Sequence, residues 1–393
     1  MKVLMINSVC GIRSTGRICT DIADVLADRG HECKIAYGRE NVPQKYEKYA
    51  VRIGSDADVK LHGAESRIFD NTGFGSKRAT KRFIEWVKEY DPDVIHLHNI
   101  HGYYINIAVL FNYLRTCGKR IVWTLHDCWS FTGHCANFEH VGCEKWKHGC
   151  SRCPQLREYP ASIVADRSEK NWLQKKRLFC GIPNMTVVTP SQWLADLVKQ
   201  SYLGEYDVRV INNGIDLSVF KPTESNFRAK CGIEDKKIVL GVASTWSDRK
   251  GLADFIKLAD MLGDEYKTVL VGLDANQMKS IPQNIIGIMR TDSVEELAGI
   301  YTAADVFVNP TYEDNYPTVN LEAQACGTPV VSYKTGGSPE SVNTDYGFVV
   351  PQGDLNAAAK RIAECAEKGK TDEHINSVDF SKHTAYNKYI DLY

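Results

Sequence analysis

The sequence of 393 residues lacks any apolar run of the about 18 residues that a membrane-spanning helix needs, which argues against an integral membrane protein. It also lacks short-period repeats and low-complexity tracts, so neither a solenoid nor a long disordered tail is expected. No secretory signal is recognisable after the apolar start at residues 1–9. Thirteen cysteines without such a signal indicate a reducing compartment, where thiols and metal ligands are commoner than disulfides.

A strong net charge is absent too. The formal value is −1 and no basic stripe spans a domain, so nucleic acid is not an expected partner. The charge is nevertheless uneven, because residues 1–216 carry 30 Lys and Arg against 24 Asp and Glu, whereas residues 217–393 carry 18 against 25. We expect the first half to approach an anionic surface or substrate.

What the sequence does contain is a regular alternation of strand and helix patterns, typical of βαβ units with parallel sheets. The strands of the first series are predicted at residues 1–9, 32–37, 94–98, 120–125, 186–189 and 208–211, and those of the second at 238–243, 268–272, 284–289, 306–309 and 329–333. The helices are predicted at 20–27, 105–114, from 191 onward, 251–262, 293–301, 318–326 and 355–367. The length suits two Rossmann-like domains of roughly 200 residues each.

The most informative segment begins at Thr311 and ends at Glu340. Pro317 predicts a helix start, where the amides of Thr318 and Val319 would meet an anion with the positive helix end behind them. Asn315, in the preceding turn, is a further candidate donor-binding residue. The pattern favours a nucleotide or phosphate site; the alternative is an ordinary helix cap followed by a tight turn.

The run L-E-A-Q-A-C-G-T-P-V-V, followed by T-G-G-S-P-E, resembles the donor-site signature of the family-four retaining glycosyltransferases. The resemblance extends over nearly the whole chain. It implies an α/β fold of the GT-B type, with two Rossmann-like domains facing across a cleft. Residues 1–216 would bind the acceptor, residues 217–376 would bind a nucleotide sugar, and a helix within residues 377–393 would cross back to the first domain.

The family also has two acidic residues in the pattern Glu-x7-Glu. Counting back from Glu322, that position holds Asp314, and Glu313 stands just before it. The resemblance implies that Glu322 holds the ribose hydroxyls of the nucleotide and that Asp314 or Glu313 faces the donor hexose. Which of the two acids does so stays open.

Arg249 and Lys250 stand at the start of a predicted helix, a position unfavourable for cations unless an anion lies there. The resemblance implies that they neutralise the donor diphosphate as it leaves. Many relatives place the Arg five residues before the Lys, where this sequence has Thr245. The alternative is a pair of solvated loop charges.

His126 follows the strand predicted at 120–125, and the resemblance implies that it contacts the donor sugar or assists the acceptor. Asp127 would orient the imidazole or act as a base. Gly16, in the predicted loop of residues 11–17, is expected near the donor diphosphate, with Arg17 as a weaker candidate. A structural role for the two strand-end residues and a plain turn at Gly16 are the alternatives.

Four cysteines fall within 19 residues, in the pattern Cys135-x7-Cys143-x6-Cys150-x2-Cys153. Such a set suits a tetrahedral zinc ion with all four positions filled by protein, which is a structural site. Free buried thiols and disulfides are the alternatives, and His134, His140 and His148 are spare ligand candidates. The flanking motifs resemble the exopolysaccharide, colanic-acid-type branch of the family, with a cysteine-rich insertion at about residues 128–160.

Lys77, Arg78, Lys81 and Arg82 recur at helical spacing and predict one basic helix face, with aromatic residues on the other. That face could lie on anionic lipid or near a lipid-linked pyrophosphate, or it could simply be solvated. Two D-x-D matches, at residues 56–58 and 91–93, are interpreted as turns, so no catalytic metal is expected.

The function expected from these patterns is transfer of a hexose, with retention, from a UDP- or GDP-sugar to a glycan acceptor, lipid-linked in bacterial exopolysaccharide, capsule or O-antigen synthesis. The expected location is the cytoplasm, with peripheral contact at the inner face of the plasma membrane. The alternatives are a nucleotide-sugar epimerase or a phosphorylase on the same fold, and a non-catalytic sugar-binding scaffold.

Overall fold

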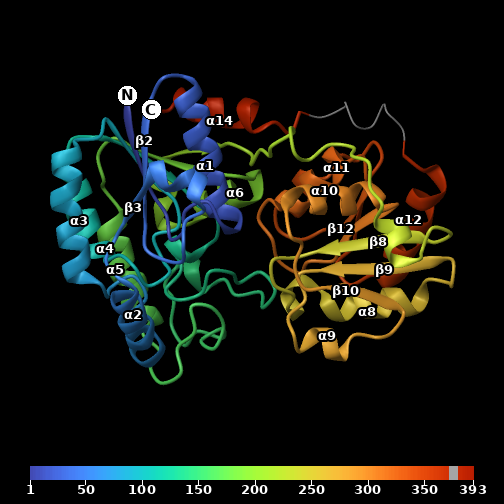
Figure 1. Ribbon diagram of the computed structural model, residues 1–393. Coiled ribbons are helices and arrows are strands. Elements are labelled where there is room, and N and C mark those ends of the chain that lie inside the picture. The colour runs from blue at the N-terminus through green and yellow to red at the C-terminus, as the bar shows by residue number, and fades with distance from the viewer. Residues whose placement is uncertain (371–378) are drawn as a thin grey trace. The chain divides into compact units, whose positions relative to one another are not determined.

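The computed structural model describes residues 1–370 and 379–393 (Figure 1). Contacts divide the chain into two compact units, the first being Met1–Asn212 with Ala385–Tyr393 and the second Asn213–Thr384. The domain boundary predicted at 216/217 lies a few residues beyond this division. The boundary predicted at 376/377 lies outside the described residues.

The first unit contains a parallel sheet of seven strands in the order β3-β2-β1-β4-β5-β6-β7. The strands are β1 (Lys2–Ile6), β2 (Glu32–Tyr37), β3 (Ala50–Arg52), β4 (Val94–Leu97), β5 (Arg120–Thr124), β6 (Met185–Thr189) and β7 (Asp207–Val210). The strand order reverses beside β1, and in such sheets ligands bind near the carboxyl ends of the strands at that point.

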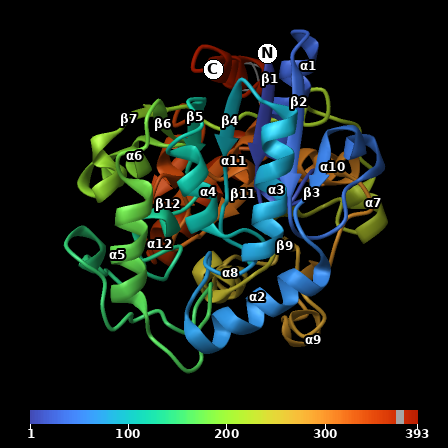
Figure 2. The same ribbon diagram turned by 90° about the vertical axis from the view of Figure 1, so that its left-hand side faces the viewer.

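Helices cover both faces of this sheet because its strands are apolar on both sides. Leu4 and Ile6 of β1 belong to one core cluster, and Val3 and Met5 belong to the other. The first cluster is covered by α3 (Lys77–Tyr90), α4 (Ile107–Leu114), α5 (Ser168–Phe179) and α6 (Gln192–Gln200), of which α3, α4 and α5 face the viewer in Figure 2. The second is covered by α1 (Arg13–Asp28) and α14 (Lys382–Ile390).

The connection from β5 to α5 is long and irregular. Its regular structure is limited to two short 3-10 helices, Trp129–Phe131 and Lys145–Lys147. Trp129, Phe131 and Trp146 are nevertheless buried and join the core cluster of α3 to α6. The loop, which contains the predicted cysteine-rich insertion, therefore packs as part of the unit.

The second unit contains a parallel sheet of six strands in the order β10-β9-β8-β11-β12-β13. The strands are β8 (Lys237–Val242), β9 (Tyr266–Val271), β10 (Ile285–Ile288), β11 (Val306–Asn309), β12 (Val330–Tyr333) and β13 (Phe348–Val350). One face carries α7 (Phe227–Cys231), α10 (Val294–Ala303) and α11 (Thr318–Ala325), and the other carries α8 (Leu252–Met261) and α12 (Leu355–Lys368). A single helical turn, α9 (Gln277–Ser280), follows β9.

The predicted strands and helices are confirmed within a few residues, with two corrections. The first helix was predicted from residue 20 but begins at Arg13, so Gly16 lies in its first turn and not in a loop. Residues 56–58 were predicted to form a turn but begin α2 (Asp56–Phe69), where Ser55 and Asp58 form a reciprocal capping box.

Candidate functional site

The ammonium group of Lys250 lies 2.5 Å from Oδ2 of Asp314, and both side chains are largely buried. Burial alone would raise the pKa of Asp314, but the charge and hydrogen bond of Lys250 outweigh burial and lower it. The amide of Asn315 donates to the other carboxylate oxygen of Asp314 at 2.9 Å. The pair therefore consists of a fixed carboxylate and a fixed cation.

Three connections meet around this pair. Lys250 follows β8, Asp314 follows β11, and the amide of Gly337, which follows β12, donates to the Asp314 carbonyl at 3.1 Å. These three strands are neighbours in the sheet. The pair thus lies at the carboxyl edge of the second sheet, where α/β folds bind ligands.

Arg249 and Glu313 are joined through the backbone. The guanidinium of Arg249 donates to the Glu313 carbonyl at 2.8 Å, and the Arg249 carbonyl accepts from the amide of Tyr312 at 2.8 Å. The side chain of Glu313 is buried. Of the two candidate acids, Asp314 is therefore the one whose carboxylate contacts a cation of this loop.

A glycine sets the geometry of the cations. Gly251 has a φ of +76°, and a Cβ on it would lie 2.1 Å from the carbonyl oxygen of Pro310. No other residue fits this conformation and this close approach without strain. Gly251 therefore holds Arg249 and Lys250 beside the segment that follows β11.

Glu322 lies on α11, and its side chain is buried. Its Oε2 accepts a hydrogen bond from the hydroxyl of Tyr301, on α10, at 3.0 Å. Thr318 and Val319 occupy the first turn of the same helix and are half-buried, as the start at Pro317 predicts. The predicted donor residues of this unit thus belong to two connections and one helix.

In the first unit, His126 follows β5 and its Nε2 lies 3.0 Å from Nδ1 of His98, which follows β4. The two rings stack at an interplanar angle of 13°. Burial lowers the pKa of His126 to about 4, although the nearby carboxylate of Asp127 opposes this shift. The imidazole is therefore neutral at pH 7 and can exchange a hydrogen bond but carries no charge.

Asp127 does not contact the His126 ring through any hydrogen bond given by the geometry; its Oδ2 lies 2.8 Å from Nε2 of His101. The other nitrogen of His101 lies 3.1 Å from the hydroxyl of Tyr159, whose side chain is exposed. Burial raises the pKa of Asp127, but His101 outweighs burial and lowers it. Asp127, His101 and Tyr159 thus form a chain from the sheet edge to the surface.

Gly16 is buried, and its carbonyl accepts from the amide of Gly11 at 3.1 Å. A Cβ on it would lie 3.0 Å from the side chain of Val9. Close packing of the first helix turn against the preceding loop explains this glycine, while Arg17 is exposed.

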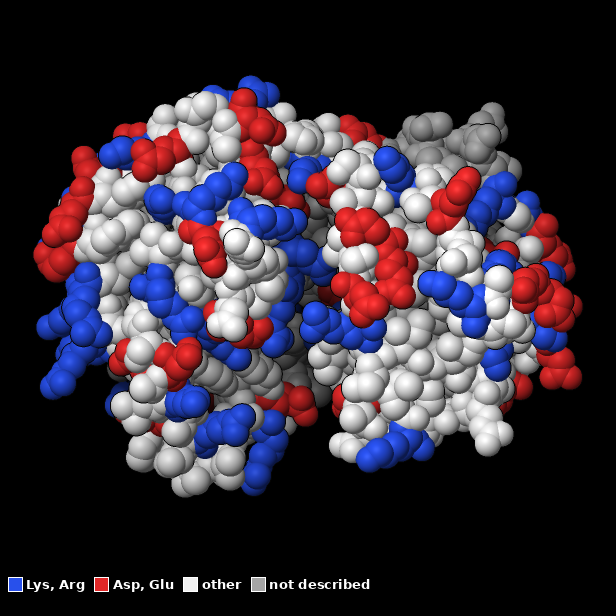
Figure 3. Space-filling model, viewed as in Figure 1, with Lys and Arg blue, Asp and Glu red and all other residues white. Residues whose placement is uncertain are grey.

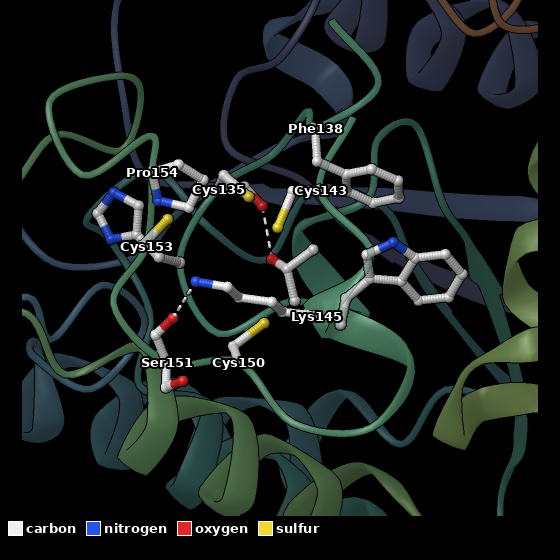
Figure 4. A pocket seen from close by; sticks show the side chains of 11 residues that line it. Cys135, Phe138, Cys143, Lys145, Cys150, Ser151, Cys153 and Pro154 are labelled. Carbon is white, nitrogen blue, oxygen red and sulfur yellow. Dashed lines mark hydrogen bonds between the residues drawn. The ribbon is translucent and has the colours of Figure 1, made fainter. Parts of the chain in front are cut away.

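The four cysteines of the predicted metal site line one small cavity of about 10 Å³ (Figure 4). A hydrogen bond between their side chains lowers the pKa of the Cys153 thiol and raises that of Cys135. All thirteen cysteines are unpaired, so the disulfide alternative is wrong. Within residues 1–370 and 379–393, however, no three His, Cys, Asp or Glu side chains converge as a metal site requires, and zinc is not supported by the geometry as it stands.

The predicted basic helix face is confirmed on α3. Lys77, Arg78, Lys81 and Arg82 are exposed, while Phe83 is buried in the core. Figure 3 shows Lys and Arg side chains gathered at the edge of this unit where α3 lies in Figure 1. In the described part of the chain, no helix has the length and apolar character needed to cross a membrane.

Sequence reasoning missed several residues of these sites. His98 and His101 stand in the run H-L-H-N-I-H that follows β4, a visible signal because parallel strands end at one edge. Tyr301 gave no signal, since its contact with Glu322 depends on the packing of α10 against α11.

Comparison with known proteins follows these geometries closely. Residues 15–219 match the family model described as Glycosyltransferase Family 4, and residues 223–378 match the model described as Glycosyl transferases group 1. The putative colanic acid biosynthesis glycosyl transferase WcaC of Escherichia coli strain K12 is 28% identical over 376 residues, which cover 90% of this chain and 88% of that protein.

Two solved structures resemble the whole chain. Sucrose-phosphate synthase from Thermosynechococcus elongatus has a TM-score of 0.70 at 16% identity, covering 100% of this chain and 98% of that one. Anabaena Alr3699/HepE in complex with UDP-glucose has a TM-score of 0.68 at 17% identity, with the same coverage. At such identities the likeness establishes the fold, which is GT-B.

Proposed function

Because the chain belongs to Glycosyltransferase Family 4, and is therefore a sugar-transferring enzyme, we propose that it moves a hexose with retention from a nucleotide sugar to a glycan acceptor. The second unit would bind the donor and the first unit the acceptor. The biological setting proposed is exopolysaccharide, capsule or O-antigen synthesis in a bacterium. The similarity to the Escherichia coli protein over 90% of the chain supports this setting.

The observation that carries the proposal is the Lys250–Asp314 pair at the carboxyl edge of the second sheet. During transfer, the bond from the anomeric carbon to the diphosphate breaks and its electron pair goes to the diphosphate oxygen. Lys250 and Arg249 are placed to neutralise that charge, and a cation already held by a carboxylate needs little reorganisation. The acceptor oxygen bonds to the anomeric carbon and its proton leaves to a base.

For the nucleotide itself, Glu322 is the proposed partner of the ribose hydroxyls, and the first turn of α11, with Thr318 and Val319, is proposed to face the diphosphate. Asn315 is proposed to line the same pocket. A UDP-sugar or a GDP-sugar would fit this arrangement. The relative from Anabaena that was solved with UDP-glucose supports testing a UDP-sugar first.

For the acceptor, we assign the base role to the chain formed by Asp127, His101 and Tyr159, with His126 as a neutral contact. Gly16 is proposed to let the backbone of the first helix turn approach the substrates. The basic face of α3 is the proposed contact with a lipid-linked pyrophosphate at the inner face of the plasma membrane.

The experiment is a thermal-shift panel with UDP, GDP, ADP and CMP, each with and without its sugar, on the wild-type chain, Glu322→Ala and Glu295→Ala. Glu295 is an exposed residue of α10 and serves as the matched control. A ligand at a hundredfold its Kd should stabilise the native state by about 2.7 kcal/mol. A shift with one nucleotide that Glu322→Ala loses and Glu295→Ala keeps supports the donor site.

If no nucleotide shifts the melting temperature, the donor proposal is wrong and a non-catalytic scaffold becomes the better interpretation. Product analysis with the bound nucleotide sugar separates the remaining alternatives. A new glycosidic bond of retained configuration supports transfer, whereas a changed hexose still attached to its nucleotide would indicate an epimerase.

A further inference from the structure

The imidazole of His134 is buried and lines the cavity of the four cysteines. Its Nδ1 lies 2.6 Å from Oδ1 of Asp70, so Nδ1–H is the donor and Nε2 carries a free lone pair. Among the described residues this Nε2 has no hydrogen-bond partner. A buried acceptor without a donor is rare in native proteins, and it therefore points to a ligand.

The carboxylate behind His134 is itself fixed. Asp70 ends α2, and its second oxygen accepts from the amide of Arg167 at 2.8 Å. Both side chains of the Asp70–His134 pair are fully enclosed. A histidine that donates one nitrogen to a carboxylate and presents the other to a cavity is the second-shell arrangement of metal-binding histidines.

Three thiols are connected around the same cavity. Cys135 and Cys153 are hydrogen-bonded to each other, and the sulfur of Cys150 accepts from the amide of Gly133 at 3.2 Å. Figure 4 shows the sulfur atoms of these cysteines, and that of Cys143, around one small space. Its volume of about 10 Å³ is near that of a single water-sized sphere, so the space suits one ion better than an organic ligand.

The backbone of this loop is anchored independently of the thiols. Asp166 accepts from the amide of Cys153 at 2.7 Å through one oxygen. Its other oxygen accepts from the amide of Ser168 at 2.9 Å and from the Ser168 hydroxyl at 2.6 Å. The loop therefore positions Cys153 without needing a sulfur contact, and the side chains only have to turn inward from positions that do not yet converge.

A buried charge selects among the possible ligand sets. Lys175 is 1% exposed, and its ammonium donates to the carbonyls of Trp129 at 2.8 Å and Thr132 at 3.2 Å. In the described residues it forms no ion pair with a carboxylate, although it interacts electrostatically with Cys150 and Cys135. A divalent ion with three thiolates and one neutral imidazole carries one negative charge, which balances this single cation, whereas four thiolates would leave one charge in excess.

We propose that His134, Cys135, Cys150 and Cys153 bind a zinc ion as a closed tetrahedral structural site, and that Cys143 is not a ligand. This set differs from the four cysteines that spacing alone predicts. The ion holds together the loop between β5 and α5, the loop that also brings Tyr159 to His101. The inference is independent of the donor and acceptor proposed above.

The test begins with the wild-type chain, purified without chelator and measured by mass spectrometry of its metal content. One zinc per chain is expected. After exchange for Co(II), the absorption spectrum should show intense tetrahedral d–d bands and thiolate-to-cobalt charge transfer. Chain without stoichiometric metal, and without these bands when Co(II) is added to the reduced protein, would overturn the proposal with no need for any variant.

The ligand set is tested with His134→Asn, Cys143→Ser and, as a matched control outside the cavity, Cys180→Ser. We expect Cys143→Ser and Cys180→Ser to keep one metal per chain and an unchanged cobalt spectrum. His134→Asn should lose the metal at least tenfold more readily to a chelator. If His134→Asn holds the metal as the wild type does and Cys143→Ser releases it, four thiolates bind the ion and the proposed set is wrong.

Discussion

Lys250 and Asp314 are separated by 63 intervening residues, yet the ammonium of one lies 2.5 Å from the carboxylate of the other. The contact exists because β8 and β11 are neighbours in the second sheet and both side chains follow the carboxyl end of their strand. A half-buried ion pair of this kind adds little net stability, since desolvation offsets the attraction. We infer that its value is positional: the carboxylate holds the cation ready for a second anion.

Replacing Lys250 by alanine should therefore slow transfer far more than it destabilises the fold. Removing a preorganised group that stabilises developing charge costs about 10²–10³-fold in kcat. The measurement is steady-state turnover of the nucleotide sugar together with the melting temperature. Lys257→Ala is the matched control, because Lys257 is an exposed lysine on the next helix and its ammonium lies 3.6 Å from Asp254. Full turnover in Lys250→Ala would show that the leaving group is stabilised elsewhere.

The two candidate acids can be separated by amide substitutions of similar shape. Asp314→Asn removes the charge that fixes Lys250, and we expect kcat to fall at least tenfold. Glu313→Gln leaves the backbone carbonyl that Arg249 contacts, so a smaller fall is expected. Turnover of both variants at equal folded fraction, checked by circular dichroism, decides the matter. The reverse order of the two effects would assign the donor-facing role to Glu313.

Gly251→Ala should destabilise the second unit because the new Cβ would lie 2.1 Å from the Pro310 carbonyl at a φ of +76°. Strain of this kind costs about 1–3 kcal/mol at a single residue, and the loop must also shift. Urea unfolding measures the loss. Gly263→Ala is the matched control, since no atom lies within 4 Å of the Cβ that it would add. Equal stability of the two variants would mean that the loop relaxes without cost, and turnover should then be normal as well.

Most of the fold could be predicted from the sequence because buried parallel strands are apolar on both faces and alternate with amphipathic helices. The strand predicted at 306–309, for example, is β11 with the same bounds. The loop between β5 and α5 could not be predicted in this way, because its buried residues Trp129, Phe131 and Trp146 follow no helical or strand period.

The sites show the same division. Spacing located Lys250, Asp314 and Glu322 in their connections, but it could not pair them, since the pairing depends on strand order and on helix packing. His134 was only a spare candidate among three histidines, because its partner Asp70 stands 64 residues earlier. A one-dimensional pattern contains the residue types of such a contact but not the fold that brings them together.

Buried neutral histidines predict that the first unit loses stability as the pH falls. Burial lowers the pKa of His62 to about 4, whereas an unfolded chain protonates histidine near its usual value of about 6.5. Between these values only the unfolded state takes up the proton, so this histidine destabilises the fold by about 1.4 kcal/mol per pH unit, and the loss stops growing below about pH 4.

His62→Gln should remove this share of the pH dependence. At pH 7 the variant should be less stable than the wild type, because Nε2 of His62 accepts from the amide of Gly75 at 3.1 Å and Nδ1 lies 3.0 Å from the Ser76 hydroxyl. As the pH falls from 6.5 to 4, the wild type loses stability faster, so the difference between the two should shrink. Urea unfolding at pH 7, 6, 5 and 4.5 measures it, with the slope against pH expected to drop by one proton in the variant. Parallel curves would mean that His62 is protonated in the folded protein, and the two hydrogen bonds drawn to its neutral ring would then be wrong.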